Sequence, residues 1–162
     1  MLFMQSNGTS PNETPPNGAP GGTPPNGAPG GAPGGQSGSN VSHTGATELT
    51  SNTNLSDQNY SSTSSAENAL LVSGATVVLT NPTINKSGDD SGDSSDFYGT
   101  NAAVFAYKNA TLDIVGGSIT TNGSHANAVF AYDSGTINIT DTKITTSSNN
   151  SGGIMVTGGG TI

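Results

Sequence analysis

The chain has 162 residues, room for one domain, and only 9% of them are charged and 30% hydrophobic, too few apolar side chains for a conventional globular core. A net charge of −8, with three lysines and no arginine, excludes the basic patch that nucleic-acid binding needs and disfavours anionic membranes. The absence of cysteine excludes disulfides and thiolate chemistry, and no segment approaches the length of a membrane-spanning helix.

The N-terminal quarter is a Pro/Gly-rich repeat. Residues 1–45 hold eight of the nine prolines, and the nine letters TPPNGAPGG at Thr14–Gly22 recur at Thr23–Gly31. Such a segment has almost nothing to bury, and glycine does not recur at every third position as collagen requires. We therefore interpret residues 1–44 as a disordered Pro/Gly/Asn-rich linker. Residues 45–65 follow as a degenerate capping coil, because Gly45-Ala46-Thr47 echoes Gly74-Ala75-Thr76.

The rest of the chain, residues 66–162, is built from repeats. Ala103–Thr121 and Ala128–Thr146, offset by 25 residues, are identical at ten of nineteen positions. A further offset of 25 reaches Ile154, and a backward offset of 35 reaches Ala69. The ten extra residues of the backward step correspond to one polar insertion, roughly Asn85 to Asp96.

Each repeat contains three short runs that alternate apolar and polar residues, separated by Gly-, Asn- and Ser-rich links. Alternation at period two indicates half-buried strands, and the links supply turns. Three strands in about 25 residues make one coil of a parallel β-helix, an all-β solenoid that the crossover rule predicts to be right-handed. Stacking the coils would bury five apolar columns: Ala69/Val104/Val129/Ile154, Leu71/Ala106/Ala131/Val156, Val77/Leu112/Ile137/Ile162, Leu79/Ile114/Ile139 and Ile84/Ile119/Ile144.

The last residue, Ile162, falls in the middle of a coil. An open stacking surface invites pairing with further strands. We therefore expect the solenoid to be C-terminally truncated, with the remaining coils of the same chain as its first partner.

The repeated NAVFAY, TINIT and KITT segments behind a Pro/Gly-rich leader resemble the right-handed parallel β-helix adhesin-like surface proteins of Gram-positive gut bacteria. More broadly, the pattern is similar to the pectate-lyase-like solenoids and autotransporter passenger domains. The resemblance covers residues 66–162, and it implies an extracellular, cell-surface protein whose export signal is not in this sequence. It also supports the right-handed winding.

Catalysis is not expected. A pectate-lyase-like site needs a strong base, typically an arginine, and the chain has none. Two carboxylates facing each other across a groove would suit a glycoside hydrolase, but Asp113, Asp133 and Asp141 align with Asn138, Lys108 and Gly116 and so share no column. We interpret His125, the one histidine inside the repeats, as a turn residue.

The insertion carries four carboxylates, Asp89, Asp90, Asp93 and Asp96, interleaved with glycine and serine. Oxygen ligands on a flexible loop can wrap a calcium ion, although the spacing is not that of an EF-hand. The alternative is a solvated, self-repelling surface loop. No other cofactor is expected.

An aromatic stripe is the candidate ligand site. If Val104 and Ala106 point inward, Phe105 and Tyr107 point outward and stack on Phe130 and Tyr132, with Leu70 and Met155 extending the column. An exposed apolar stripe usually indicates an interaction surface, and aromatic faces suit sugar rings. The alternatives are that the leader or the insertion folds back over the stripe, or that the phase is reversed.

Two functions are compatible with these features. The first is a non-catalytic, adhesin-like module that contacts a host or cell-wall glycan, or a surface protein, through repetitive side-chain ladders. The second is a structural stalk or cell-wall layer component. A more distant alternative is a non-catalytic piece of a polysaccharide-active β-helix enzyme.

Overall fold

A computed structural model describes residues 41–162 of the chain. Most of the predicted linker, residues 1–40, lies outside the described residues, as do the Pro/Gly repeats on which that prediction rests. The described residues all belong to one compact unit, Gly35–Ile162.

Within residues 41–162 the chain forms thirteen short strands and one helix. The strands are β1 (Gly45–Leu49), β2 (Thr53–Ser56), β3 (Asn59–Ser62), β4 (Asn68–Ser73), β5 (Thr76–Thr80), β6 (Thr83–Lys86), β7 (Val104–Tyr107), β8 (Thr111–Val115), β9 (Ser118–Thr121), β10 (Val129–Ala131), β11 (Thr136–Thr140), β12 (Lys143–Thr146) and β13 (Ile154–Val156). The helix, α1 (Asp93–Tyr98), lies between β6 and β7.

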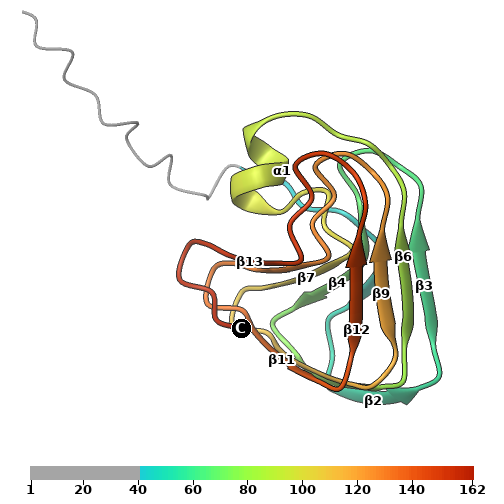
Figure 1. Ribbon diagram of the computed structural model, residues 1–162. Helices are drawn as coiled ribbons and strands as arrows, with labels where there is room; N and C mark the ends of the chain where they lie inside the picture. The colour runs from blue at the N-terminus through green and yellow to red at the C-terminus, as the bar shows by residue number, and fades with distance from the viewer. Residues whose placement is uncertain (1–40) are drawn as a thin grey trace, which may run out of the picture. The chain divides into compact units, whose positions relative to one another are not determined.

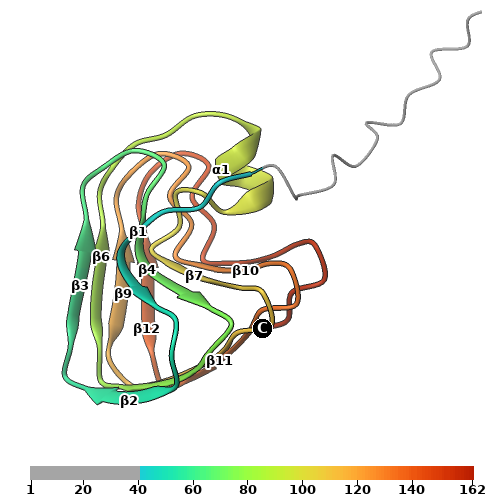
Figure 2. The same cartoon turned by 180° about the vertical axis from the view of Figure 1, so that it is seen from behind.

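The strands assemble into three parallel sheets, because every third strand pairs with the equivalent strand of the next coil. Sheet A has the order β1-β4-β7-β10-β13, sheet B β11-β8-β5-β2, and sheet C β12-β9-β6-β3. The sheets form the sides of the coil, with sheet C along one edge and sheet B across the base (Figure 1), and β1 is seen in the view from behind (Figure 2). This is the predicted right-handed parallel β-helix with three strands per coil.

The first coil is β1, β2 and β3, which pair with β4, β5 and β6. Gly45 lies opposite Asn68 in this pairing, whereas Gly74 precedes β5. The two tripeptides of the sequence echo, Gly45-Ala46-Thr47 and Gly74-Ala75-Thr76, therefore do not occupy equivalent positions in successive coils. The first tripeptide lies in β1, whereas Gly74 and Ala75 form the link before β5 and Thr76 is the first residue of that strand.

The interior columns of sheets B and C are confirmed. Leu79 lies opposite Ile114, which lies opposite Ile139, and the columns through Leu112 and Ile119 likewise follow the predicted register. These side chains form one continuous apolar core. Each coil can bury its few apolar residues only because neighbouring coils cover them.

The predicted register of sheet A between β4 and β7 is wrong by one residue. Val104 lies opposite Leu70, not Ala69, and Ala106 lies opposite Val72, not Leu71. The residue that extends the outward Phe105 column is accordingly Leu71, not Leu70. The cause is the link to the next strand, two residues after β4 but three after β7.

The turn between sheets B and C contains a residue with a positive φ in every coil. These residues are Asp57 at 55°, Asn81 at 56°, Gly116 at 70° and Asp141 at 52°, and Gly117 at 75° follows Gly116 in the third coil. Aspartate and asparagine tolerate this left-handed conformation better than other non-glycine residues. Asn81 Nδ2 also donates to Asp57 Oδ1 at 2.7 Å, so the turn carries a polar ladder.

The insertion is not simply a loop, because it contains α1, which the sequence did not predict. Six residues are too few for a readable helical period, and the helix is bounded by Gly92 and by Gly99, whose φ of 71° is left-handed. Asp93 and Asp96 lie in its first turn, where negative charge favours a helix.

Three buried asparagines attach the insertion to the solenoid by donating to its main-chain carbonyls. Asn101 Nδ2 donates to Gly88 O at 2.9 Å, Asn127 Nδ2 to Ser95 O at 3.2 Å, and Asn68 Nδ2 to Gly99 O at 2.8 Å. Backbone carbonyls that leave water need such partners. The insertion is thereby held against the coils along most of its length.

A buried lysine lies where the insertion leaves sheet C. Lys86 is 1% exposed and occupies the interior column with Ser62 and Thr121. Its Nζ donates to Ser64 O at 2.5 Å and to Gly88 O at 3.3 Å. Burial lowers the pKa of Lys86, and the nearby carboxylates of Glu67, Asp90 and Asp89 oppose that shift only in part.

This lysine makes stability depend on pH. Because the pKa of Lys86 is lower in the folded chain than in the unfolded one, the unfolded chain binds more protons between the two values. The free-energy cost of burying the charged Lys86 is therefore largest below the pKa of the folded chain. This cost decreases as the pH rises toward the pKa of the unfolded chain, about 10.4. We expect the free energy of unfolding of the wild type, relative to Lys86→Met, to rise across this alkaline window. Urea denaturation of both chains at a series of pH values measures it, and parallel curves would contradict it.

Candidate functional site

The aromatic stripe lies on the outer face of sheet A, with the phase predicted for Val104 and Ala106. Leu71, Phe105 and Phe130 stack in register on three successive strands, and Met155 continues the column. Together with Ala102 and Tyr132 they form a second apolar cluster, separate from the coil interior. The stripe is therefore a packed layer on the outside of the solenoid.

The phenylalanines of the stripe are covered, and the prediction that they are exposed to a ligand is wrong. Phe105 and Phe130 are each 0% exposed. The His43 ring stacks on Phe105 at 4.3 Å between centroids and 16° between planes, and its Nε2 donates to Tyr98 O at 2.7 Å. Tyr98, at the end of α1, meets Tyr132 edge-on at 5.9 Å. Both alternative covers, the end of the leader and the insertion, are thus in place.

The tyrosines of the stripe border an open hollow. Its volume is about 330 Å³, and it is lined by Val41, Ser42, His43, Tyr107, Lys108, Tyr132 and Asp133. Lys108 Nζ lies 4.7 Å from the centre of the Tyr107 ring, a cation–π distance. Lys108 and Asp133 follow β7 and β10 at equivalent turn positions with left-handed backbone, so successive coils bring opposite charges to one rim. We call this the tyrosine hollow.

The charge state of the hollow follows from burial. Burial, and to a smaller extent the charge of Lys108, lowers the pKa of His43 below its ordinary 6.5, so the imidazole is neutral at pH 7. Burial also raises the pKa of Tyr132, with smaller contributions from Tyr98 and Asp133, so its hydroxyl keeps its proton. At pH 7 the hollow presents neutral aromatic rings beside one ammonium and one carboxylate.

Sequence reasoning found two of the lining side chains and missed the others. Tyr107 and Tyr132 were predicted, whereas His43 lies outside the repeats and has no periodic signal. Lys108 and Asp133 each directly follow a tyrosine of the stripe and occupy equivalent positions. Their positions next to the two tyrosines could therefore have identified them as lining residues from the sequence.

Two carboxylates of the acidic insertion accept hydrogen bonds that hold the insertion against the coils. Asp89 Oδ1 accepts from Ser124 N at 2.7 Å, and Asp90 accepts from Ser95 Oγ at 2.5 Å and Ser65 Oγ at 3.2 Å. Burial acts to raise the pKa of Asp90, but the hydrogen bonds from Ser95, the Ser91 backbone and Ser65, together with the charge of His125, outweigh it and lower that pKa. Asp93 and Asp96 lie on α1. Among residues 41–162 no three histidine or acidic side chains gather to hold a metal ion, so the calcium alternative gains no support.

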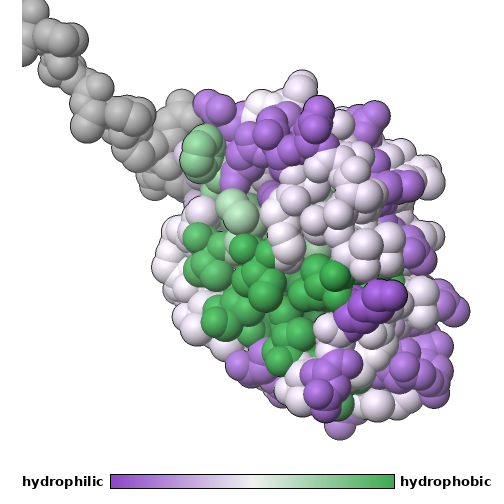
Figure 3. All heavy atoms as spheres, viewed as in Figure 1, coloured by the Kyte–Doolittle hydropathy of each residue, from purple (hydrophilic) through white to green (hydrophobic). Residues whose placement is uncertain are grey.

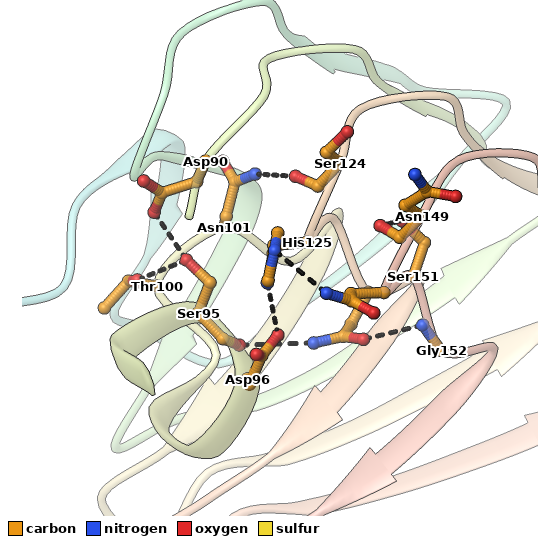
Figure 4. Close-up of polar contacts among 12 residues, drawn as sticks. Asp90, Ser95, Asp96, Thr100, Asn101, Ser124, His125, Asn149, Ser151 and Gly152 are labelled. Atoms are coloured by element: carbon orange, nitrogen blue, oxygen red, sulfur yellow. Dashed lines mark hydrogen bonds and ion pairs between the residues drawn. The ribbon is translucent and has the colours of Figure 1, made fainter. Parts of the chain in front are cut away.

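Asp96 connects α1 to two later coils through His125 (Figure 4). His125 Nδ1 lies 2.7 Å from Asp96 Oδ1, and because a carboxylate only accepts, Nδ1 carries the proton. Nε2 then accepts from Asn150 Nδ2 at 3.1 Å. The φ of His125 is 55°, as suits the predicted turn residue. Its partner Asp96, 29 residues earlier, had no sequence signal.

An Asp–His pair is also the orienting half of a hydrolytic triad, which needs a hydroxyl on Nε2. Here Asn150 occupies Nε2. Nearby serines donate elsewhere, Ser148 Oγ to Asn122 O at 2.6 Å and Ser151 Oγ to Gly123 O at 2.8 Å. The arrangement acts as a clamp between α1 and the coils.

Comparison of the chain with protein families, with curated proteins and with solved structures finds no match. None of the helices formed by the described residues is long and apolar enough to cross a membrane.

Proposed function

We propose that this chain is a non-catalytic, adhesin-like binding module of an extracellular cell surface, and that it holds a glycan in the tyrosine hollow. The observation that carries the proposal is the convergence of Tyr107, Tyr132, Lys108 and Asp133 on one open hollow of about 330 Å³. That volume lies at the lower end of the range of about 300–1,000 Å³ for small-molecule sites.

The chemistry of the hollow suits a sugar. The partly buried Tyr107 ring offers apolar surface to the C–H side of a pyranose and a hydroxyl to its rim, whereas Tyr132 is 9% exposed and forms a buried part of the wall. Lys108 and Asp133 add one strong donor and one strong acceptor, which can orient hydroxyls or an acidic substituent. The backbone under these residues is rigid, since β7 and β10 pair in register within sheet A. A preorganised site loses less entropy on binding.

The proposal is tested on a glycan array with neutral and acidic oligosaccharides, using the full chain. Tyr107→Ala is expected to weaken the best binding at least tenfold, because it removes the ring that forms one wall and supports Lys108. Val115→Ser, at an exposed position on sheet B, is the matched surface control and should bind like the wild type. Far-UV circular dichroism verifies that both variants fold. Equal binding by Tyr107→Ala and the wild type would reject the hollow as the site.

A structural stalk is the second candidate, and one surface feature favours it. Ile154, Val156 and Ile162 are exposed, and an apolar patch is visible over this part of the molecule (Figure 3). Ile154 and Val156 continue interior columns of sheet A, so a further coil or a second solenoid could stack on them. A folded wild type that binds no glycan on the array would leave this function as the better one.

A further inference from the structure

A second hollow lies between α1 and the turn before β13. Its volume is about 640 Å³. It is lined by Asp96, Phe97, Asn127, Ser148, Asn149, Asn150, Ser151, Gly152 and Met155. We call it the amide groove. In Figure 4, Asp96 lies on the helix side and Asn149, Ser151 and Gly152 on the opposite side. None of its lining residues belongs to the tyrosine hollow.

The groove holds an exposed aromatic ring on a fixed support. Phe97 is 57% exposed, although most aromatic side chains of residues 41–162 are buried or partly buried. Its backbone is held in place, because Phe97 O accepts from Thr157 Oγ1 at 2.7 Å and its neighbour Asp96 is bonded to His125. An apolar ring presented to solvent on a rigid segment is preorganised for contact with a ligand.

Several polar groups around this ring have hydrogen-bonding atoms that are not used within the described part of the chain. Asp96 uses Oδ1 for His125 and Asn150 uses Nδ2, which leaves Asp96 Oδ2 and Asn150 Oδ1 as acceptors. The exposed side-chain amide of Asn149 makes no hydrogen bond to the part of the chain that the structure describes. Asn127 fixes the floor, where its Oδ1 accepts from Gly152 N at 2.7 Å. The groove is therefore lined from both walls by residues with unused acceptors, and the Asn149 and Asn150 amides also have unused N–H donors.

This arrangement selects a class of ligand. A carboxylate and amide oxygens need hydrogen-bond donors, and adjacent hydroxyls of a sugar supply them in pairs. The lining contains no lysine or arginine, so an acidic sugar would meet the Asp96 carboxylate without a compensating cation. Phe97 and Met155 supply apolar surface for the C–H face of the ring. We infer that the amide groove is a second binding site, specific for neutral, hydroxyl-rich saccharides.

The clamp formed by Asp96, His125 and Asn150 also has a role in the groove. Asp96, His125 and Asn150 join the helix wall to the turn wall, so the clamp sets the width of the groove. Gly152 keeps the floor open, because a Cβ there would lie 2.9 Å from Met155 Sδ and 3.0 Å from Asn127 Oδ1. Asp96 and Asn150 therefore both line the groove and hold the insertion against the coils.

The test is a ¹H–¹⁵N NMR titration of the full chain with neutral trisaccharides of glucose, galactose, mannose and N-acetylglucosamine, and with trigalacturonic acid as the acidic probe. At least one neutral sugar should shift the side-chain amide signals of Asn149 and Asn150 saturably. Phe97→Ser should weaken that binding at least tenfold, and Val115→Ser should leave it unchanged.

The outcomes separate the two proposed sites. Tyr107→Ala should weaken binding in the tyrosine hollow at least tenfold and leave the Asn149 and Asn150 shifts intact. The amide groove is rejected if no neutral sugar moves these signals, if Phe97→Ser binds like the wild type, or if trigalacturonic acid binds there more tightly than every neutral sugar. These three rejecting results concern the amide groove alone and leave the proposal for the tyrosine hollow unchanged.

Discussion

Replacing Ile114 by aspartate is expected to abolish the folded state of the solenoid. Ile114 is 0% exposed and lies in the interior column of sheet B between Leu79 and Ile139. A carboxylate there would have apolar neighbours above and below it in the stack. An unpaired buried charge costs several kcal/mol, a large part of the roughly 5–15 kcal/mol that stabilises a typical domain.

Two further substitutions in the same sheet make the test specific. Thr80→Asp places the same charge on the outer face, where Thr80 is exposed, and should change the free energy of unfolding by no more than about 0.5 kcal/mol. Ile139→Asp should fall between, because Ile139 is only partly buried. Far-UV circular dichroism shows whether Ile114→Asp still folds, and urea denaturation gives the free energies of unfolding of the other two variants. A wild-type midpoint for Ile114→Asp would mean that the assignment of inward and outward faces is reversed.

The sequence was sufficient for these columns because sheets B and C follow a strict alternation. Each strand there has one buried and one outer face, so period two identifies the inward side chains, as for Leu112 and Ile114. Sheet A has no such contrast. The run Ala69–Val72 is apolar throughout, since its outer face is also covered, and two registers fit it equally well.

The candidate sites were less predictable, for a different reason. Their defining contacts are single hydrogen bonds that do not repeat along the chain. They join residues 55, 29 and 60 positions apart, namely His43 and Tyr98, Asp96 and His125, and Phe97 and Thr157. A repeat comparison detects what recurs in every coil and is blind to a single cover or clamp. The aromatic stripe was visible in the sequence and its two covering segments could be named as alternatives, but the contacts that hold these segments on the stripe had no sequence signal.

The cover over the stripe depends on Gly99. We expect Gly99→Ala to destabilise the chain by about 2–5 kcal/mol, the sum of about 1–2 kcal/mol for a left-handed alanine and about 1–3 kcal/mol for overpacking. Gly99 has a φ of 71°, and its carbonyl accepts from buried Asn68 Nδ2. An added Cβ would lie 2.6 Å from Phe130 Cγ and 2.8 Å from Phe105 Cε2. Because both rings are packed on sheet A, the insertion has to move outward.

Gly74→Ala separates the two contributions. Gly74 has a similar φ of 59°, but a Cβ there would meet only Lys108 O, at an ordinary 3.6 Å. This variant should lose only the conformational part, about 1–2 kcal/mol, and keep the stripe covered. In Gly99→Ala we expect displaced phenylalanine rings, seen as increased binding of a hydrophobic dye and a changed near-UV circular dichroism spectrum, while the far-UV spectrum of the β-helix persists. Equal stability losses and equal dye binding in the two variants would show that the insertion does not pack against the stripe.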